Sequence, residues 1–164
     1  MSPFASRAAA ETGATSGLAD VDDAHCFIVF VGGERFGLPV ERVQTIFPIE
    51  AITPVPLGPA EILGLVNLRG KIVTAVSLRR RLQLPEDDNR KAALAVGMEH
   101  RGESFALVVD EVGDVIVLDG KARIPMPPHL DHQRAKLTEA VYRLDDGILP
   151  QLDMGAIFDF QRRA

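Results

Sequence analysis

Few residues in this chain combine types and spacing that could do chemistry. His129 and His132 lie three positions apart around Asp131, and in a helix this spacing would place both imidazoles on one face, where they could bind a metal ion. The sequence offers no evident third or fourth ligand beside them, and the surrounding prolines are typical of a surface loop. We therefore expect no metal at these residues.

Catalytic groups are equally scarce. The one cysteine, Cys26, begins an apolar run, which favours a small buried side chain over a reactive thiol. Asp145 and Asp146 precede Gly147, a pattern typical of a tight turn rather than of an acid–base pair. The chain also lacks a Gly-x-Ser-x-Gly motif, a phosphate-binding loop and a dinucleotide-binding glycine motif. These features predict a protein that is not an enzyme and that binds no cofactor.

Arginines are the remaining polar residues of interest. The run Arg79–Arg81 is expected to form the solvated face of a short helix, with a phosphate or partner contact as the alternative. Arg69 differs, because it lies beside Asn67 and Gly70 in a predicted turn between two aliphatic runs. A guanidinium group there is suited to bidentate pairing with a carboxylate, either within the protein or across an interface.

Short β-strands are the elements expected to position these residues. Val, Ile and Leu dominate the apolar runs, and turn residues separate one run from the next. The predicted hairpins join Cys26–Val31 to Arg35–Val40, Leu65–Leu68 to Lys71–Leu78, Ala92–Met98 to Glu103–Val109, and Ala140–Leu144 to Ile148–Leu152, with further strands in Glu41–Phe47 and Val112–Leu118.

Helix is expected to be minor. Pro59 can open a short helical turn over Ala60–Leu63, and Leu78–Leu82 forms another short helical segment. Met154–Phe160 is predicted to be a terminal helix with Asp153 as its N-cap. Many short strands with little helix predict an all-β protein built from small barrels.

The sequence also repeats itself. Gly33–Val43 aligns with Gly102–Val112, with identical Gly, Glu, Phe, Leu and Val positions and an acidic residue kept as Glu41 and Asp110. We infer two similar β-subdomains, at about 25–85 and 90–160, although chance similarity between apolar strands is an alternative. A flexible arm over 1–24 and a short tail over 161–164 would flank them.

Composition limits the possible functions. The 164 residues are 46% hydrophobic and carry a formal net charge of −5, which argues against general binding of nucleic acid. Only one Tyr and no Trp are present, so stacking platforms for bases are not expected. No apolar run approaches the roughly 20 residues that span a bilayer, and the first residues do not resemble a secretory signal. We expect a cytoplasmic protein.

A series of motifs makes the chain resemble one family. The motifs are Phe36–Val40, Val43, Ile46, Ile52–Pro56, Gly64–Gly70, Leu78-Arg79 and Val109–Val112. In this order they resemble the CheW family, and the resemblance covers about residues 25–160. It implies two SH3-like five-stranded β-barrel subdomains around a shared aliphatic core. It also implies a non-catalytic adaptor that couples chemoreceptors to the CheA histidine kinase at membrane-associated receptor arrays.

The same resemblance implies which surface binds the receptor. A groove would accept the cytoplasmic tip of a methyl-accepting chemoreceptor, whereas the residues that bind the regulatory domain of the CheA-type kinase stay unassigned. The implied receptor-binding residues are Val43, Thr45, Asn67, Leu68, Arg69 and Gly70.

Three positions depart from the family pattern. Thr45 stands where the family commonly has a Glu that pairs with the arginine corresponding to Arg69, so Arg69 must use Glu41, Glu50, water or a partner. Thr74 and Ser77 stand where Pro and Asp are common. An alternative function is therefore a CheW-like scaffold that binds a kinase in a specialised non-chemotactic pathway without binding standard receptors.

Overall fold

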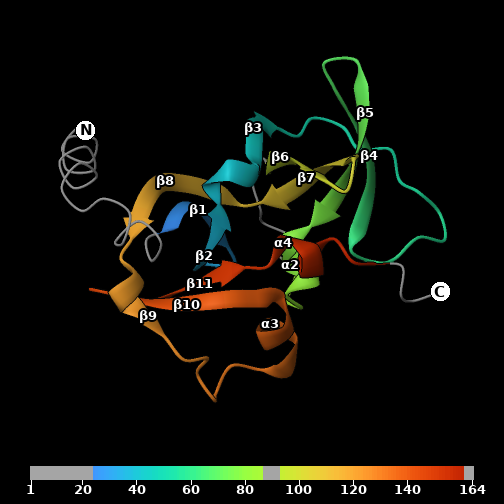
Figure 1. Ribbon diagram of the computed structural model, residues 1–164. Helices are drawn as coiled ribbons and strands as arrows, with labels where there is room; N and C mark the ends of the chain where they lie inside the picture. Colours follow the sequence, from blue (N-terminus) through green and yellow to red (C-terminus); the bar gives the residue numbers. More distant parts are fainter. Residues whose placement is uncertain (1–23, 87–92, 161–164) are drawn as a thin grey trace.

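The computed structural model describes residues 24–86 and 93–160 (Figure 1). These residues form two β-sheets joined by short helices, so the predicted all-β architecture with minor helix is confirmed. Of the predicted arm over 1–24, only Ala24 is described, and it belongs to the first strand. The predicted tail over 161–164 lies outside the described residues.

The first sheet contains six strands. Their spatial order is β8-β1-β2-β11-β10-β9, and each neighbouring pair is antiparallel except β11 with β2. In that order the strands are Glu111–Leu118, Ala24–Val31, Glu34–Pro39, Gly147–Leu152, Thr138–Leu144 and Arg123–Ile124. The expected five strands become six because the two-residue strand β9 pairs with β10.

The second sheet contains five strands, as expected. Their spatial order is β3-β6-β7-β5-β4, and here β5 and β7 form the parallel pair. In that order the strands are Val43–Pro48, Leu94–His100, Glu103–Val109, Lys71–Ser77 and Ile62–Leu68. A bridge between Thr53 and Leu65 ties the segment after β3 to the edge strand β4.

The strand pairing differs from the expected division of the chain into consecutive halves at 25–85 and 90–160. The hairpin β1–β2, from the first half, belongs to the sheet whose other strands are β8, β9, β10 and β11. The hairpin β6–β7, from the second half, belongs to the sheet whose other strands are β3, β4 and β5. The two parallel pairs, β11 with β2 and β5 with β7, hold this exchange in place. Each sheet is therefore assembled from both halves of the chain.

Strand register confirms the internal repeat. Ile28 pairs with Gly37 in the β1–β2 hairpin, and Gly97 pairs with Ala106 in the β6–β7 hairpin. Both residues of the second pair lie 69 positions after those of the first (28 to 97 and 37 to 106). The aligned motifs predicted from the sequence thus occupy equivalent places in the two sheets.

The later hairpins are related in the same way with a longer spacing. Ile62 pairs with Val76 between β4 and β5, and Thr138 pairs with Leu152 between β10 and β11. Here the spacing is 76 positions (62 to 138 and 76 to 152). The second half therefore carries seven more residues than the first between its hairpins, and these lie before β10.

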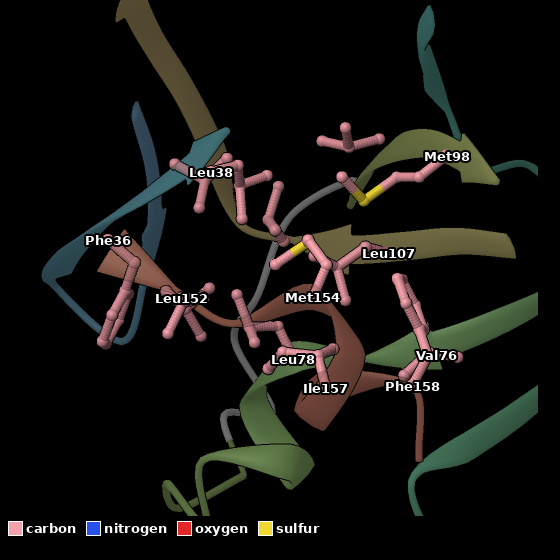
Figure 2. Packing of buried hydrophobic residues seen from close by; sticks show 14 of the residues in the cluster. Phe36, Leu38, Val76, Leu78, Met98, Leu107, Leu152, Met154, Ile157 and Phe158 are labelled. Atoms are coloured by element: carbon pink, nitrogen blue, oxygen red, sulfur yellow. The ribbon is translucent and has the colours of Figure 1, made fainter. Parts of the chain in front are cut away.

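A single aliphatic core connects the two sheets. Figure 2 shows Phe36 and Leu38 of β2 facing Leu107 of β7 across a cluster of buried side chains. Residues of the terminal helix, among them Met154 and Ile157, fill the space between them. The predicted shared core is therefore present, and smaller apolar clusters lie within each sheet.

The helices are short and differ partly from expectation. Asp153 caps α4 as predicted, but the helix covers Met154–Ile157 and ends before Phe160. The segment Ala60–Leu63 is not helical: the amide of Ile62 donates to the carbonyl of Pro59 in a turn, and β4 begins at Ile62. The other helices are α2 at Leu78–Arg81, α3 at His132–Leu137, and the 3-10 turns η1 at Val40–Arg42 and η2 at Gly120–Ala122.

Replacing Leu107 tests the shared core. Leu107 is 0% exposed and belongs to the central cluster, so Leu107→Ala should lower the free energy of unfolding by about 2–5 kcal/mol. Urea denaturation followed by circular dichroism measures this change. Ile72 is 58% exposed on β5, and Ile72→Ala should change stability by less than about 0.5 kcal/mol. Equal losses in the two variants would contradict the assignment of the core.

Candidate partner-binding surface

The turn between β4 and β5 presents Arg69 to solvent. Arg69 and Gly70 have φ angles of 55° and 83°, and Leu68 pairs with Lys71 on either side of them. Two successive positive φ angles are typical of a type I′ turn, which matches the twist of a hairpin. The side-chain oxygen of Asn67 accepts a hydrogen bond from the amide of Gly70 at 2.9 Å. The turn is therefore locally fixed, with its arginine outside.

Arg69 lacks an internal counter-ion in the described part of the chain. None of the ion pairs formed within residues 24–86 and 93–160 involves its guanidinium group. Glu41 and Glu50, the internal carboxylates considered from the sequence, are exposed and unpaired with it. Within the described residues, Arg69 is therefore available to a carboxylate from a partner.

Val43 and Thr45 lie on β3, at the opposite edge of the same sheet from β4. Val43 packs against the shared core, and Thr45 pairs with Gly97 of β6. A Cβ atom at Gly97 would lie 2.7 Å from the Thr45 methyl group, so a glycine is needed there for close packing. The structure thus places the implied receptor-binding residues in two groups, the pair on β3 and the turn Asn67–Gly70, which belong to strands at opposite edges of one sheet.

The segment after β3 closes the barrel on which both groups lie. The amide of Thr53 donates to the carbonyl of Leu65 at 2.9 Å, and the amide of Leu65 donates back at 2.8 Å. Gly64 makes this approach possible, because its φ is 145° and a Cβ atom there would lie 2.2 Å from the Thr53 carbonyl oxygen. This close contact gives a physical reason for the glycine that begins the motif Gly64–Gly70.

A separate hollow of about 790 Å³, with both polar and apolar walls, opens beside this barrel. None of the six implied receptor-binding residues lines it. Its wall is built from Leu57–Ala60, Ile62, Thr74, Glu103, Phe105, Phe158 and Phe160. Neither Glu103 nor Phe105 was predicted from the sequence as a site residue, although the motif Gly-Glu-x-Phe, which contains both, occurs in each repeat.

Arg79 does not belong to a solvated helix face, which corrects the expectation for Arg79–Arg81. It is 6% exposed and forms an ion pair of 2.7 Å with Asp110, which also accepts a hydrogen bond from the amide of Gly32 at 2.9 Å. This contact joins α2 to the β7–β8 junction and to the β1–β2 turn. The cause is the packing of α2, whose residue Leu78 enters the shared core.

Arg81 is also mostly buried, whereas Arg80 fits the expectation. The Arg81 guanidinium donates to the carbonyl oxygens of Ala156 and Ile157 at 2.7 and 2.9 Å, at the end of α4. Arg80 is exposed and pairs with Glu86 at 3.1 Å. Two of the three arginines therefore hold the two halves of the chain together.

The histidine cluster considered from the sequence is not assembled as a metal site. Asp131 caps α3 by accepting from the amide of Arg134 at 2.8 Å, and His129 and His132 are both exposed. Within the described ranges, no three His, Cys, Asp or Glu side chains are placed to hold a metal ion.

Cys26 lies in the apolar interior, and the Asp145-Asp146 pair lies in a turn. Cys26 is fully buried as predicted, and burial raises the pKa of its thiol to about 12, with Glu41 adding to the effect. Asp145 and Asp146 lie in the turn between β10 and β11, as expected. The Arg35 side chain donates hydrogen bonds to Asp146 and holds the pKa of that carboxyl below its ordinary value.

Comparison with known proteins identifies the family. The model of the CheW-like domain matches residues 25–162, which is most of the chain. This chain belongs to the CheW-like family. Among the described helices, none is long and apolar enough to cross a membrane.

Relatives of this CheW-like chain cover most of its length. The chemotaxis protein CheW of Bacillus subtilis (strain 168) is 27% identical over 142 residues, which are 86% of this chain and 91% of the relative. CheW of Helicobacter pylori is 25% identical over 140 residues, covering 85% and 84%. The crystal structure of the scaffolding protein TtCheW from Thermoanaerobacter tengcongensis matches with a TM-score of 0.74 and 26% identity, covering 84% of this chain and 94% of that one. The family is one of scaffolding and adaptor proteins.

Removing Asp110 tests the buried ion pair. Asp110→Ala leaves the Arg79 guanidinium without its counter-ion, so the free energy of unfolding should fall by about 3 kcal/mol. Glu86→Gln breaks the exposed pair on the same helix and should cost about 0–1 kcal/mol. Urea denaturation of the two variants makes the comparison. A small effect of Asp110→Ala would show that Arg79 does not hold the sheets together.

Proposed function

We propose that this CheW-like chain is a non-catalytic adaptor that couples chemoreceptors to a CheA-type histidine kinase. The family match over residues 25–162 supports an adaptor, and the related TtCheW is described as a scaffolding protein. The observation that carries the proposal is the exposed Arg69 without an internal counter-ion, held on a fixed turn of the motif that marks the family.

The adaptor would use different surfaces for its two partners. Val43, Thr45 and the turn Asn67–Gly70 would bind the cytoplasmic tip of a methyl-accepting chemoreceptor. Another surface would bind the regulatory domain of the kinase. The shared core would connect them physically, since side chains of both sheets pack within it.

The proposal includes neither catalysis nor a cofactor. Two of the groups considered from the sequence occupy structural positions: Cys26 is buried in the core, and Asp131 caps a helix. The net charge of −5 disfavours nucleic acid as a partner. We place the protein in the cytoplasm, at membrane-associated receptor arrays that it reaches through its partners and without inserting into the membrane.

A second candidate function rests on Thr45. If the family's Glu contributes to receptor binding, its replacement would leave a scaffold that binds a kinase in a non-chemotactic pathway. Separate pull-down experiments with a receptor fragment and with a kinase regulatory domain distinguish the two functions. Binding to the kinase domain but not to the receptor would favour the second.

Arg69→Glu tests the receptor surface. It should weaken binding of a receptor fragment by about 2–5 kcal/mol, because like charges would face each other in a desolvated pair. Binding of the kinase regulatory domain and the melting temperature should hardly change, since the side chain is exposed. Isothermal titration against each partner separately measures both affinities.

Arg101 provides a matched control. It is exposed in the turn between β6 and β7, with a φ of 53° and Gly102 following it, so its backbone resembles that of Arg69. Arg101→Glu should leave receptor binding unchanged. If Arg69→Glu unfolds the protein or weakens both partners equally, Arg69 has a structural role and the receptor surface lies elsewhere.

A further inference from the structure

The two halves of the chain differ in what covers one equivalent pair of residues, a glutamate and a phenylalanine. Glu34 and Phe36 of β2 correspond to Glu103 and Phe105 of β7 by the spacing of 69 positions that the strand register establishes. Both glutamates begin their strands, and both phenylalanines point into the shared core. The same acidic and aromatic pair is therefore presented twice.

In the six-stranded sheet, an arginine of the chain covers this pair. Arg134 of α3 donates two hydrogen bonds to the two carboxylate oxygens of Glu34, at 2.8 and 3.0 Å. Its guanidinium carbon also lies 5.6 Å from the centre of the Phe36 ring. A bidentate ion pair combined with a cation–π contact is a recognition mode that suits arginine rather than lysine.

In the five-stranded sheet, the equivalent arginine is missing. Counting back from Arg134 by the 76 positions that separate β10 from β4 leads to Gly58, which lies in the irregular segment before β4 and has no side chain to reach across. Glu103 is exposed, and within residues 24–86 and 93–160 no cationic side chain pairs with it. Gly58, Glu103 and Phe105 all line the 790 Å³ hollow.

The rest of the hollow suits the stem of such a side chain. Phe158 stacks on Phe105 with ring centres 4.4 Å apart, and Ile62 adds an aliphatic surface. The methylene groups of an arginine pack well on apolar walls while the guanidinium group reaches a carboxylate. Glu103 is the acidic residue among those that line the hollow.

We propose that this hollow binds an arginine side chain of a protein partner, in the place that Arg134 fills in the other half. The occupant is a segment that presents one arginine between apolar residues, with its guanidinium group paired to Glu103. The site lies apart from the proposed receptor-binding residues and goes beyond the proposed function, since it requires a protein partner but not a receptor.

A first experiment supplies the arginine within the chain. Gly58 has no positive φ, and a Cβ atom there would meet Val55 atoms at 3.8 Å, which is ordinary contact, so Gly58→Arg can be accommodated. The variant should raise the melting temperature, and the gain should disappear when Glu103→Gln is added. An equal gain with and without Glu103 would contradict the pairing.

A second experiment supplies the arginine from outside. The probe is a capped Leu-Arg-Leu tripeptide, titrated into the full isotope-labelled chain while the amide resonances of Gly58, Glu103 and Phe105 are followed. These resonances should shift in a saturable manner with millimolar affinity. A matched tripeptide with citrulline in place of arginine should bind about tenfold more weakly or worse, since the charge-assisted hydrogen bonds are lost.

Variants assign the binding to the hollow. Glu103→Gln should weaken the arginine tripeptide about tenfold, and Gly58→Arg should abolish its binding by filling the site. Glu99→Gln removes an exposed carboxylate from the neighbouring strand β6 and should change nothing. Equal binding of the arginine and citrulline peptides, shifts confined to other residues, or no saturable shift would each overturn the proposal.

Discussion

Parallel pairing between strands from different halves of the chain is the constraint on which the rest of this structure depends. Because β11 pairs with β2 and β5 pairs with β7, neither half completes a sheet by itself. The hairpins must be exchanged, and their buried faces meet in one core with α2 and α4 between them. Arg79 and Arg81 then bind across this junction, so their burial follows from the exchange.

A repeated backbone with different side chains suits the proposed adaptor, which would bind two unlike partners. The turn between β4 and β5 carries the unpaired Arg69, whereas the equivalent turn between β10 and β11 carries Asp146, already paired with Arg35. Likewise, Arg134 covers Glu34 and Phe36 in one sheet. In the other sheet, Glu103 and Phe105 line an open hollow. The repeat therefore supplies two barrels of one fold, and substitution at a few positions gives them different surfaces.

Local features were predictable from the sequence because they depend on neighbouring residues. Glycine-containing turns separated the apolar runs, Asp153 marked the start of α4, and the buried Cys26 followed from its apolar run. The exchange of hairpins was not predictable, since parallel partners lie far apart in the sequence. The burial of Arg79 was missed for the same reason: its partner Asp110 comes from another part of the chain. The assignment of Val43, Thr45 and the turn Asn67–Gly70 to receptor binding stays a prediction.

Kinase output in a reconstituted system measures the adaptor function most directly. The rate of autophosphorylation of a cognate CheA-type kinase would be followed with its receptor, in the presence and in the absence of this chain. We expect receptor control of the kinase only when all three components are present, and we expect it to be lost with Arg69→Glu but kept with Arg101→Glu. Receptor control that is unchanged by omitting the chain would contradict the proposed adaptor function.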